Sequence, residues 1–565
     1  MSKKVVIIGG VATGPKAAAR FRRLDPTADI TIVERDDIVS YAGCGTPYYV
    51  KGDIAEFNEL IETPVGTPRD AAFFRNVKNI TVLTRTLAER VDRERKVVSI
   101  VNLDTNEHRE LPYDKLVLAT GGTPILPPFP GVDLKRVFTL RSPHDGAAIR
   151  DAINSGKVKK AVIVGAGLIG LEMCEALAAR GIEVTIVEMF QHVLPGLLDI
   201  EPATFVGRHM KAQGIRTIMG EKVTGLEGDH LGNVKRVITD KQSIETDMVV
   251  VAVGVRPNDQ LARAAGLKVA KKGGILVNEY MQTSDPDIYA GGDCVLCKHL
   301  ISGETVYVPL GSTANKHGRV IGTNLAGGRE TFPGIVGTAV VKHCDFNIGR
   351  TGLSETKARE LGYDVVTALA PAPDHAHYYP GAKVILVKLI ADARTRRVLG
   401  IQVVGPGEAV KRVDVVATAL CTGATVDDLA YLDLGYAPPY SGALDHVIHA
   451  ANIIRNKLDG IAKAISPIEV KAKMDAGEDF VFLDVRGPAE YEAMRIEDPR
   501  VKLIPLGKLR SSLDQLPKDK EIITFCKISL RGYEAQRILE GAGFEHVRFM
   551  DGGVIAWPYE IVQGS

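Results

Sequence analysis

The sequence of 565 residues contains no apolar run near the roughly 20 residues that a membrane-spanning helix requires. Neither sign of charge dominates: 70 Lys and Arg residues stand against 69 Asp and Glu residues, so no global field attracts nucleic acid or an anionic membrane. The seven cysteines are an odd number scattered along the chain, which is not the pattern of a disulfide framework. These absences favour a soluble, cytoplasmic protein with free thiols.

The N-terminus also lacks the features of a secretion signal. Met1 to Lys4 run directly into the apolar stretch Val5–Ile8, which leaves no room for a separate apolar region and a cleavage site. We therefore expect no cleaved leader. The chain is too long for one hydrophobic core, and about one domain per 100–200 residues predicts three or four domains.

Two segments about 155 positions apart repeat one design. Each has a β-branched strand, a glycine-rich turn, a helix of small residues and a second strand that ends in an acid. The first repeat spans residues 5–34 and the second spans residues 161–188. Both have the form of a Rossmann βαβ unit, so we predict an α/β protein with two Rossmann-like dinucleotide-binding domains.

The glycine turns and the terminal acids predict how each nucleotide is held. The turn brings the backbone close to a pyrophosphate, and the acid about twenty residues later binds ribose hydroxyls. Ordinary packing is the alternative, more so in the first repeat, where Val11 replaces the middle glycine. In the second repeat Glu188 is followed by Met189 and Phe190 rather than by arginine, which favours NADH over NADPH.

Three further motifs, Ala119–Gly122, Gly254–Asn258 and Ile288–Asp293, resemble those of the pyridine nucleotide-disulfide oxidoreductase family over about residues 1–455. The resemblance implies an FAD domain interrupted by an NADH domain, then an α+β dimerisation domain. The residues that it implies for FAD binding are Gly9, Gly10, Val11, Ala12, Gly14, Glu34, Arg35, Ala119, Thr120, Gly121 and Asp293, the last on the ribityl chain. The residues that it implies for NADH binding are Gly165, Gly167, Leu168, Ile169, Gly170, Glu188 and Gly254.

Cys44 stands alone where typical members of this family carry a redox-active pair. Their motif is Cys-x4-Cys, whereas the second position here is Tyr49, so no internal disulfide can form. A lone thiol beside a flavin can form a mixed disulfide with an external thiol. It can also pass through sulfenic acid when the oxidant is peroxide or dioxygen.

The stretch Ser40–Gly45, with Tyr378–Gly381 and Tyr436–Ser441, resembles the coenzyme A disulfide reductase branch. This resemblance implies a homodimer in which Tyr378 and Tyr436 come from the partner subunit and donate to a leaving thiolate. The alternative is that both are core aromatics.

Coenzyme A would then bind near Cys44. Arginines on or near the first helix suit its phosphates, and a solvated charged face is an equal alternative for them. The residues predicted to contact coenzyme A are Arg20, Arg22, Ser40, Tyr41 and Arg69.

Cys294 and Cys297 form a Cys-x2-Cys pair directly after Asp293. A tetrahedral metal site needs four ligands, and no second such pair or paired His group completes them. We therefore predict a structural role for the pair and no metal.

A last block alternates strands and helices again. Residues 522–525 are predicted to form a buried strand, 526–531 a loop and 532–539 a helix, so Cys526 lies at a helix N-terminus, where a thiolate is stabilised. The Cys-x5-Arg loop from Cys526 to Arg531 fits a sulfur-transfer enzyme or a cysteine phosphatase. The segments 483–486, 504–506 and 552–557 resemble a rhodanese domain, in which Cys526 would carry a persulfide. A catalytically silent rhodanese fold is the alternative.

The resulting division of the chain has four domains and a linker. They are an FAD-binding domain at 1–150 and 275–325, an NADH-binding domain at 151–274, a dimerisation domain at 326–455, a linker at 456–466 and an α/β rhodanese domain at 467–565.

The hypothesis that unites these features is an FAD-dependent reductase. It would use NADH to reduce coenzyme A disulfide, coenzyme A persulfide or polysulfide through a mixed disulfide at Cys44, with Cys526 handling sulfane sulfur. Whether coenzyme A is a substrate or a bound cofactor stays open. The rivals are an NADH oxidase or peroxidase that cycles Cys44 through sulfenic acid, and a redox-sensing or sulfur-carrier protein.

Overall fold

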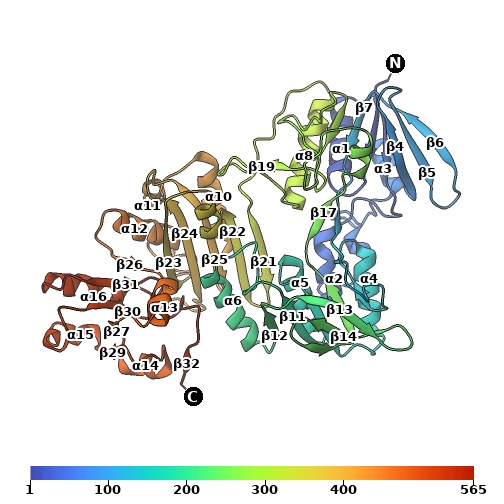
Figure 1. Cartoon of the computed structure of the whole chain (residues 1–565). Coiled ribbons are helices and arrows are strands. Elements are labelled where there is room, and N and C mark those ends of the chain that lie inside the picture. The colour runs from blue at the N-terminus through green and yellow to red at the C-terminus, as the bar shows by residue number, and fades with distance from the viewer. Residues whose placement is uncertain (1, 565) are drawn as a thin grey trace. The chain divides into compact units, whose positions relative to one another are not determined.

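A computed structural model describes residues 2–564 of the chain, which divide into two compact units. The first unit comprises the chain up to Met189 together with Glu221–Ile335, and the second comprises Phe190–Gly220 together with the chain from Val336 onward. The segment Phe190–Gly220 therefore belongs to the second unit, although it lies inside the range predicted for the NADH-binding domain. Figure 1 shows the elements of both units.

The first unit contains the two predicted parallel sheets. One has the strand order β18-β7-β1-β2-β3, and its neighbours are all parallel. Its strands are almost entirely apolar and buried, as expected of a parallel sheet that is covered on both faces. Their bounds are β1 (Lys4–Ile8), β2 (Asp29–Val33), β3 (Thr81–Leu83), β7 (Lys115–Leu118) and β18 (Ile288–Ala290). Helix α1 (Thr13–Leu24) packs against α8 (Gly311–Leu325) beside it.

The second parallel sheet repeats this design. Four of its strands follow the order β11-β10-β16-β9, and α5 (Leu168–Ala179) connects β10 to β11. Their bounds are β9 (Val137–Phe138), β10 (Lys160–Val164), β11 (Glu183–Glu188) and β16 (Met248–Val251). Smaller antiparallel sheets are formed by β4 (Thr86–Asp92), β5 (Val97–Asn102) and β6 (His108–Pro112), and by β13 (Val223–Gly228), β14 (Val234–Thr239) and β15 (Ser243–Glu245).

The second unit begins with an antiparallel sheet of order β21-β22-β25-β24-β23, against which α6, α10 and α12 pack. The bounds are α6 (Ile200–Ala212), β21 (Ala339–His343), β22 (Phe346–Gly352), β23 (Val365–Pro373), β24 (Val384–Asp392), β25 (Val398–Gly405), α10 (Val410–Thr422) and α12 (His446–Leu458). Helix α6 comes from the inserted segment Phe190–Gly220. It also carries Arg208, which donates to the backbone carbonyls of Trp557 and Tyr559 in the C-terminal block.

The C-terminal block forms a parallel sheet of order β26-β31-β30-β27-β29. The bounds are β26 (Ala464–Ile465), β27 (Phe480–Asp484), β29 (Val501–Leu503), β30 (Glu521–Phe525) and β31 (Val547–Met550), with the helices α13 (Pro467–Asp475) and α16 (Leu530–Gly541). Within the predicted linker, α12 continues to Leu458 and β26 begins at Ala464, so the irregular connection is shorter than expected. The backbone N–H of Lys463 also donates to the Gln536 side chain over 3.1 Å, which fixes that connection to the sheet.

The predicted fold class is confirmed: two parallel dinucleotide-type sheets, an antiparallel α+β sheet and a parallel C-terminal sheet. Among residues 2–564, none of the helices combines the length and the hydrophobicity needed to cross a membrane.

Candidate functional site

Four neighbouring strands of the first sheet end at one edge, where the residues predicted for FAD binding gather. Gly9 follows β1, Glu34 follows β2, Ala119 follows β7 and Asp293 comes shortly after β18. The carboxyl ends of parallel strands are where open α/β sheets bind their ligands. The sheet topology thus brings together residues that lie up to 284 positions apart in the sequence, from Gly9 to Asp293.

The turn after β1 is shaped by contacts that only glycine permits. Gly9 has φ +111°, and a Cβ atom there would lie 2.1 Å from the carbonyl oxygen of Ala119. The Gly10 N–H donates to Oε2 of Glu34 over 2.7 Å, and the Asp36 N–H donates to Oε1 over 3.0 Å. The turn therefore presents bare backbone beside a fixed carboxylate, and this arrangement fits the pyrophosphate and ribose of FAD.

The turn that carries Asp293 is held by partners that sequence reasoning missed. Arg141 Nη2 donates to Asp293 Oδ2 over 2.8 Å. His317 Nδ1 accepts the Gly292 N–H over 3.1 Å, and its Nε2 lies 3.6 Å from the Cys297 sulfur. Burial lowers the pKa of His317 to about 4, so the ring is neutral and its Nε2–H donates to the sulfur.

The Cys294 and Cys297 thiols are part of this support. Both side chains are buried, and burial raises the pKa of each thiol, that of Cys297 to about 12. Thiols of this kind remain protonated at neutral pH and are poor nucleophiles. Their environment supports the structural role predicted for the pair.

The second sheet has an equivalent turn after β10, where the residues predicted for NADH binding lie. Gly165 has φ +103°, and a Cβ atom there would lie 2.6 Å from the Ala252 carbonyl oxygen. The Ala166 N–H donates to Oε2 of Glu188 over 2.8 Å, as the Gly10 N–H does to Glu34 in the first sheet. The Gly254–Asn258 motif has a structural role. The Asn258 side-chain amide donates to the backbone carbonyl of Thr120, and the Thr120 hydroxyl donates to the backbone carbonyl of Asn258.

Cys44 lies in the 3-10 helix η1 (Gly43–Gly45), directly before helix α2 (Thr46–Lys51), and it is exposed. Although the residue is exposed, the surrounding protein partly desolvates its sulfur and so raises the pKa of the thiol. The carboxylates of Glu172 and Asp293 raise this pKa further, and the guanidinium of Arg141 lowers it. Tyr49, at the position of the missing second cysteine, is buried, and the guanidinium of Arg150 lies 4.5 Å from its ring centre. Its place in the core explains how the fold accommodates a bulky residue there.

Glu172 is a second residue that sequence reasoning missed. It lies on α5, which packs against α2 and is joined to it by an ion pair of 3.0 Å between Lys51 and Glu175. Burial and the nearby charge of Glu175 raise the pKa of Glu172 to about 7. The sequence signal that could have identified Glu172 is the presence of acids on α5, whose other residues are all uncharged.

The three arginines predicted to contact coenzyme A have protein partners in this structure. Arg20 donates to the Thr323 hydroxyl over 3.1 Å, and Arg22 donates to the carbonyls of residues 25, 26 and 79. Arg69 Nε approaches a carbonyl at 3.4 Å. Ser40 has φ +53°, and burial raises the pKa of Tyr41 to about 12. Their role in binding coenzyme A stays a prediction.

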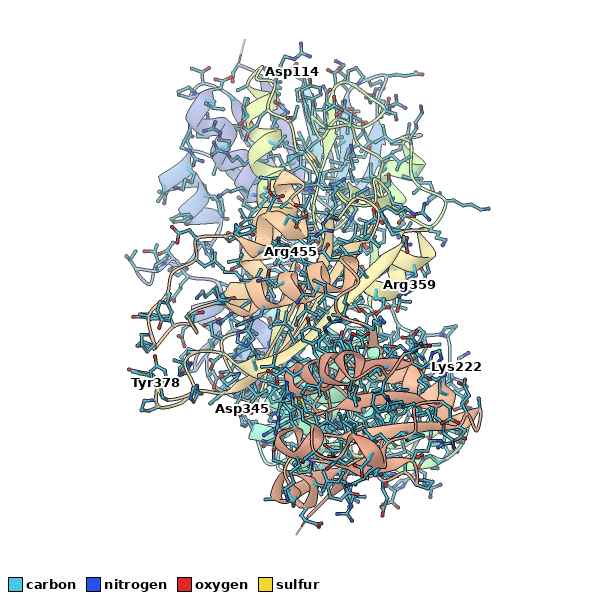
Figure 2. All side chains as sticks on the ribbon, turned by 90° about the vertical axis from the view of Figure 1, so that its left-hand side faces the viewer. Asp114, Lys222, Asp345, Arg359, Tyr378 and Arg455 are labelled. Carbon is cyan, nitrogen blue, oxygen red and sulfur yellow. The ribbon has the colours of Figure 1, made fainter. Side chains whose placement is uncertain are left out.

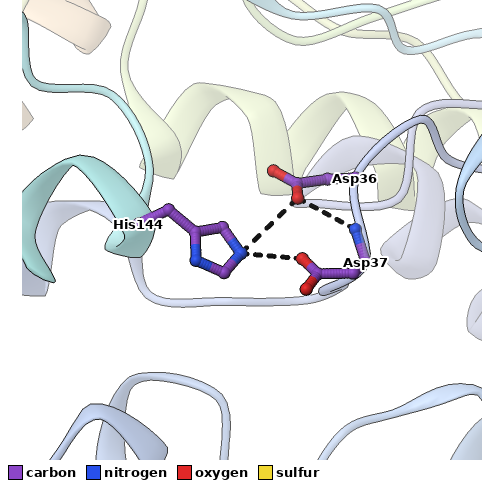
Figure 3. A group of neighbouring side chains, drawn as sticks. All are labelled: Asp36, Asp37 and His144. Carbon is purple, nitrogen blue, oxygen red and sulfur yellow. Dashed lines mark hydrogen bonds and ion pairs between the residues drawn. The ribbon is translucent and has the colours of Figure 1, made fainter. Parts of the chain in front are cut away.

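Figure 3 shows a group of possible metal ligands formed by Asp36 and Asp37, which follow β2, and by His144. The His144 Nε2 lies 2.7 Å from Asp37 Oδ1 and 3.6 Å from Asp36 Oδ1. The group is largely exposed and already contains its own ion pairs. We assign it no metal.

Tyr378 and Tyr436 lie in the second unit, on loops that follow β23 and precede α12. Their side chains are 67% and 54% exposed, so neither is a core aromatic of its own chain. A hydrogen bond between the two hydroxyls raises the pKa of Tyr378. Figure 2 shows Tyr378 at the outer edge of its loop.

Cys526 directly follows β30, and α16 begins at Leu530, two residues earlier than predicted. The carbonyls of Cys526 and Lys527 accept the N–H groups of Val554 and Ile555 over 3.0 and 3.2 Å. Since these carbonyls are held on one side, the loop can turn its N–H groups toward the sulfur. The Cys526 side chain has no exposed surface in this conformation.

Arg531 lies on α16 and pairs with a carboxylate of helix α14 (Pro488–Ala493). Its Nη1 and Nη2 donate to the two carboxylate oxygens of Glu490, both over 2.7 Å. The pKa of Arg531 is raised by the hydrogen bond with Glu490, and a hydrogen bond with Cys526 contributes. The sequence motif pointed to Cys526 and Arg531 but not to Glu490.

Three family models match the chain. The model described as pyridine nucleotide-disulphide oxidoreductase matches residues 3–318. A second model, described as the dimerisation domain of pyridine nucleotide-disulphide oxidoreductase, matches residues 338–448. A rhodanese-like domain matches residues 466–559.

Relatives match over most or all of the chain. The solved structure of an NAD-dependent persulfide reductase from A. fulgidus is 46% identical, with a TM-score of 0.93 over 98% of this chain and 100% of that one. The reduced Bacillus anthracis CoADR-RHD is 36% identical, with a TM-score of 0.92 over 99% of this chain and 98% of that one. The NAD(P)H sulfur oxidoreductase (CoA-dependent) of Pyrococcus abyssi is 39% identical over 455 residues, which cover 80% of this chain and 99% of its own.

Proposed function

We propose a function from the premise that the chain belongs to the pyridine nucleotide-disulphide oxidoreductase family and is an NAD(P)H-dependent flavoprotein that acts on disulfides or persulfides. Its C-terminal domain belongs to the rhodanese-like domains. The proposed reaction is the NADH-driven reduction of coenzyme A persulfide, coenzyme A disulfide or polysulfide through a mixed disulfide at Cys44.

One observation carries this proposal. Cys44 is an exposed thiol beside the edge where the FAD residues gather, and the position of a second thiol is filled by the buried Tyr49. The sulfur that completes the disulfide must therefore come from an external molecule.

FAD held at the edge formed by Gly9, Glu34 and Asp293 would supply the electron pair that NADH brings to the mixed disulfide. The Cys44 thiolate attacks one sulfur of R–S–S–R, which forms a mixed disulfide between Cys44 and R–S and releases R–S⁻. With R–S–SH, attack on the inner sulfur forms the same mixed disulfide and releases HS⁻. Reduction of the mixed disulfide by two electrons then releases the second R–S⁻ and restores the thiolate. We assign proton donation to the leaving thiolate to Tyr378 and Tyr436 of a second copy, since these exposed hydroxyls lie on the domain that matches the family's dimerisation domain.

Glu188 supports NADH as the proposed reductant. Its carboxylate is fixed by the Ala166 N–H, and a fixed negative charge favours ribose hydroxyls over a 2′-phosphate. In the C-terminal domain, Cys526 is proposed to accept sulfane sulfur and to present it to Cys44 or to coenzyme A.

The test is steady-state oxidation of NADH with coenzyme A persulfide, hydrogen peroxide or dioxygen as the acceptor. We expect turnover with the persulfide, its loss in Cys44→Ser and its retention in Cys421→Ser, which removes another exposed thiol. Preferential turnover with peroxide or dioxygen would instead support the oxidase or peroxidase. Full persulfide reduction by Cys44→Ser would overturn the role of Cys44.

A further inference from the structure

Arg531, the arginine of the Cys526 loop, is paired with the carboxylate of Glu490. The Arg531 guanidinium donates two hydrogen bonds of 2.7 Å to Glu490, and about a third of each side chain is exposed. These hydrogen bonds lower the pKa of Glu490 to about 2, so the carboxylate is charged throughout the physiological range. Bidentate Arg–carboxylate pairs are among the strongest in proteins.

Glu490 is held in place from both sides. Its Oε2 accepts the Gly487 N–H over 3.2 Å, and its backbone carbonyl accepts a hydrogen bond of 3.1 Å from Arg486. Arg486 is itself buried and paired with Asp484 over 2.6 Å. The carboxylate of Glu490 is therefore held in a fixed position beside Arg531.

The pair lies directly beside the thiol. The Cys526 sulfur is close enough to the Arg531 guanidinium to help raise its pKa, after the larger effect of the hydrogen bond with Glu490. An anion that approached Cys526 would compete with Glu490 for the Arg531 guanidinium, and it would meet the charge of that carboxylate.

The remaining surface of the loop is largely apolar. Leu530 is 59% exposed, Ile528 is partly exposed and Lys527 is the exposed cation. Such an apolar surface suits a sulfur donor whose sulfur is attached to an alkyl chain, rather than a small, strongly hydrated dianion.

We propose that Glu490 is a specificity-determining residue that neutralises Arg531 and thereby restricts Cys526 to alkyl persulfides, against inorganic dianions such as thiosulfate. This inference rests on the proposed role of Cys526 as a sulfur acceptor and specifies its substrate class. In the favoured step, the Cys526 thiolate attacks the terminal sulfur of R–S–SH. A new S–S bond forms in Cys526–S–SH, the original S–S bond breaks and R–S⁻ leaves, with no net oxidation.

The first test uses the full chain and two carboxylate variants of one helix. Glu490→Gln removes the charge that pairs with Arg531, and Glu492→Gln removes a 76% exposed charge that approaches Arg495 at 3.9 Å. Both are assayed for thiocyanate formation from cyanide with thiosulfate and with 2-hydroxyethyl persulfide. We expect Glu490→Gln to raise kcat/KM for thiosulfate relative to the persulfide by about 10-fold, and Glu492→Gln to leave this ratio within about twofold.

The second test separates charge from access to the buried thiol. Alkylation of Cys526 by anionic iodoacetate and neutral iodoacetamide is followed by peptide mass mapping. A change that merely opens the loop speeds both reagents equally, whereas removal of the carboxylate charge raises the iodoacetate to iodoacetamide ratio, by about 10-fold. Equal ratios in the two carboxylate variants would overturn the inference.

Cys526→Ser distinguishes this inference from the function on which it rests. Loss of thiocyanate formation in that variant supports Cys526 as the acceptor, and the carboxylate variants then decide the role of Glu490 alone. Undiminished thiocyanate formation in Cys526→Ser would overturn both.

Discussion

Arg412 and Asp445 form a buried ion pair, with 2.9 Å between Nη2 and Oδ2 and at most 2% of either side chain exposed. Arg412 Nη2 also donates to the backbone carbonyl of Asp374 over 2.6 Å. Asp374 begins the loop that carries Tyr378, and Asp445 ends the loop that carries Tyr436. One guanidinium therefore joins the bases of the two tyrosine loops.

Replacing Arg412 with Met should destabilise the second unit. It leaves the buried Asp445 carboxylate with only the more distant Lys411, 3.9 Å away, and the loss of one partner of a buried pair costs about 3–5 kcal/mol. Arg396→Met, which removes a partly exposed pair with Asp427, should cost less than about 1 kcal/mol. Urea unfolding followed by fluorescence measures both, and equal losses would contradict the anchoring role of Arg412.

The same pair predicts a pH dependence. Burial raises the pKa of Asp445, but Arg412 and the Val447 N–H outweigh it and the net pKa is lowered. A carboxyl with a lowered pKa in the folded state stabilises the fold above its ordinary pKa of 3.8, and this contribution is lost as the pH falls through the folded value. The destabilisation caused by Asp445→Asn should therefore shrink at acidic pH, as urea unfolding at several pH values would show. A pH-independent difference would contradict it.

Gly9→Ala should prevent retention of FAD. The added Cβ would lie 2.1 Å from a carbonyl oxygen, at φ +111°, so the turn after β1 must shift. Gly156→Ala is the matched control, because Gly156 has φ +72° but no atom within 4 Å of the added Cβ. The flavin absorbance of the purified variants measures the effect, and a Gly9→Ala protein with a full complement of flavin would refute it.

Glu172→Gln should change how the reactivity of Cys44 depends on pH. Above its pKa of about 7, Glu172 is charged and raises the pKa of the Cys44 thiol; below that pH it is neutral. Removing the carboxylate should therefore speed alkylation of Cys44 by iodoacetamide about threefold above pH 7 and little below it. Glu183→Gln, which changes an exposed acid on strand β11, should leave the profile unaltered. An identical profile in both variants would argue against the coupling.

Lys388→Met should loosen the inserted segment Phe190–Gly220. Lys388 is 1% exposed, and its Nζ lies 2.7, 2.8 and 3.5 Å from Glu201, Glu355 and Asp199. Without the lysine these carboxylates lose their shared buried cation, at a cost of about 3–5 kcal/mol. Faster hydrogen exchange in α6 would show the loss, and Lys342→Met, an exposed lysine of the same sheet, is the control. Unchanged exchange in α6 would exclude this role.

Much of the fold was accessible from local patterns. The βαβ repeats at 5–34 and 161–188 predicted the two parallel sheets, because glycine turns and apolar strands depend on backbone sterics over a few residues. The start of α16 was placed two residues late, since Ser529 takes φ +99° before the helix and no sequence pattern marks that conformation. The assignment of Phe190–Gly220 to the second unit depends on buried contacts such as that of Lys388, which no local pattern records.

The sequence by itself determined that two dinucleotide sites exist and that Cys44 has no neighbouring second cysteine, since both follow from residue types at short spacing. Only the tertiary structure decided which charges face the reactive groups. Arg141 reaches Asp293 across 152 positions, and Arg531 reaches Glu490 across 41. Electrostatic partners are set by distance in space, and that distance is fixed when the strands pair and the helices pack.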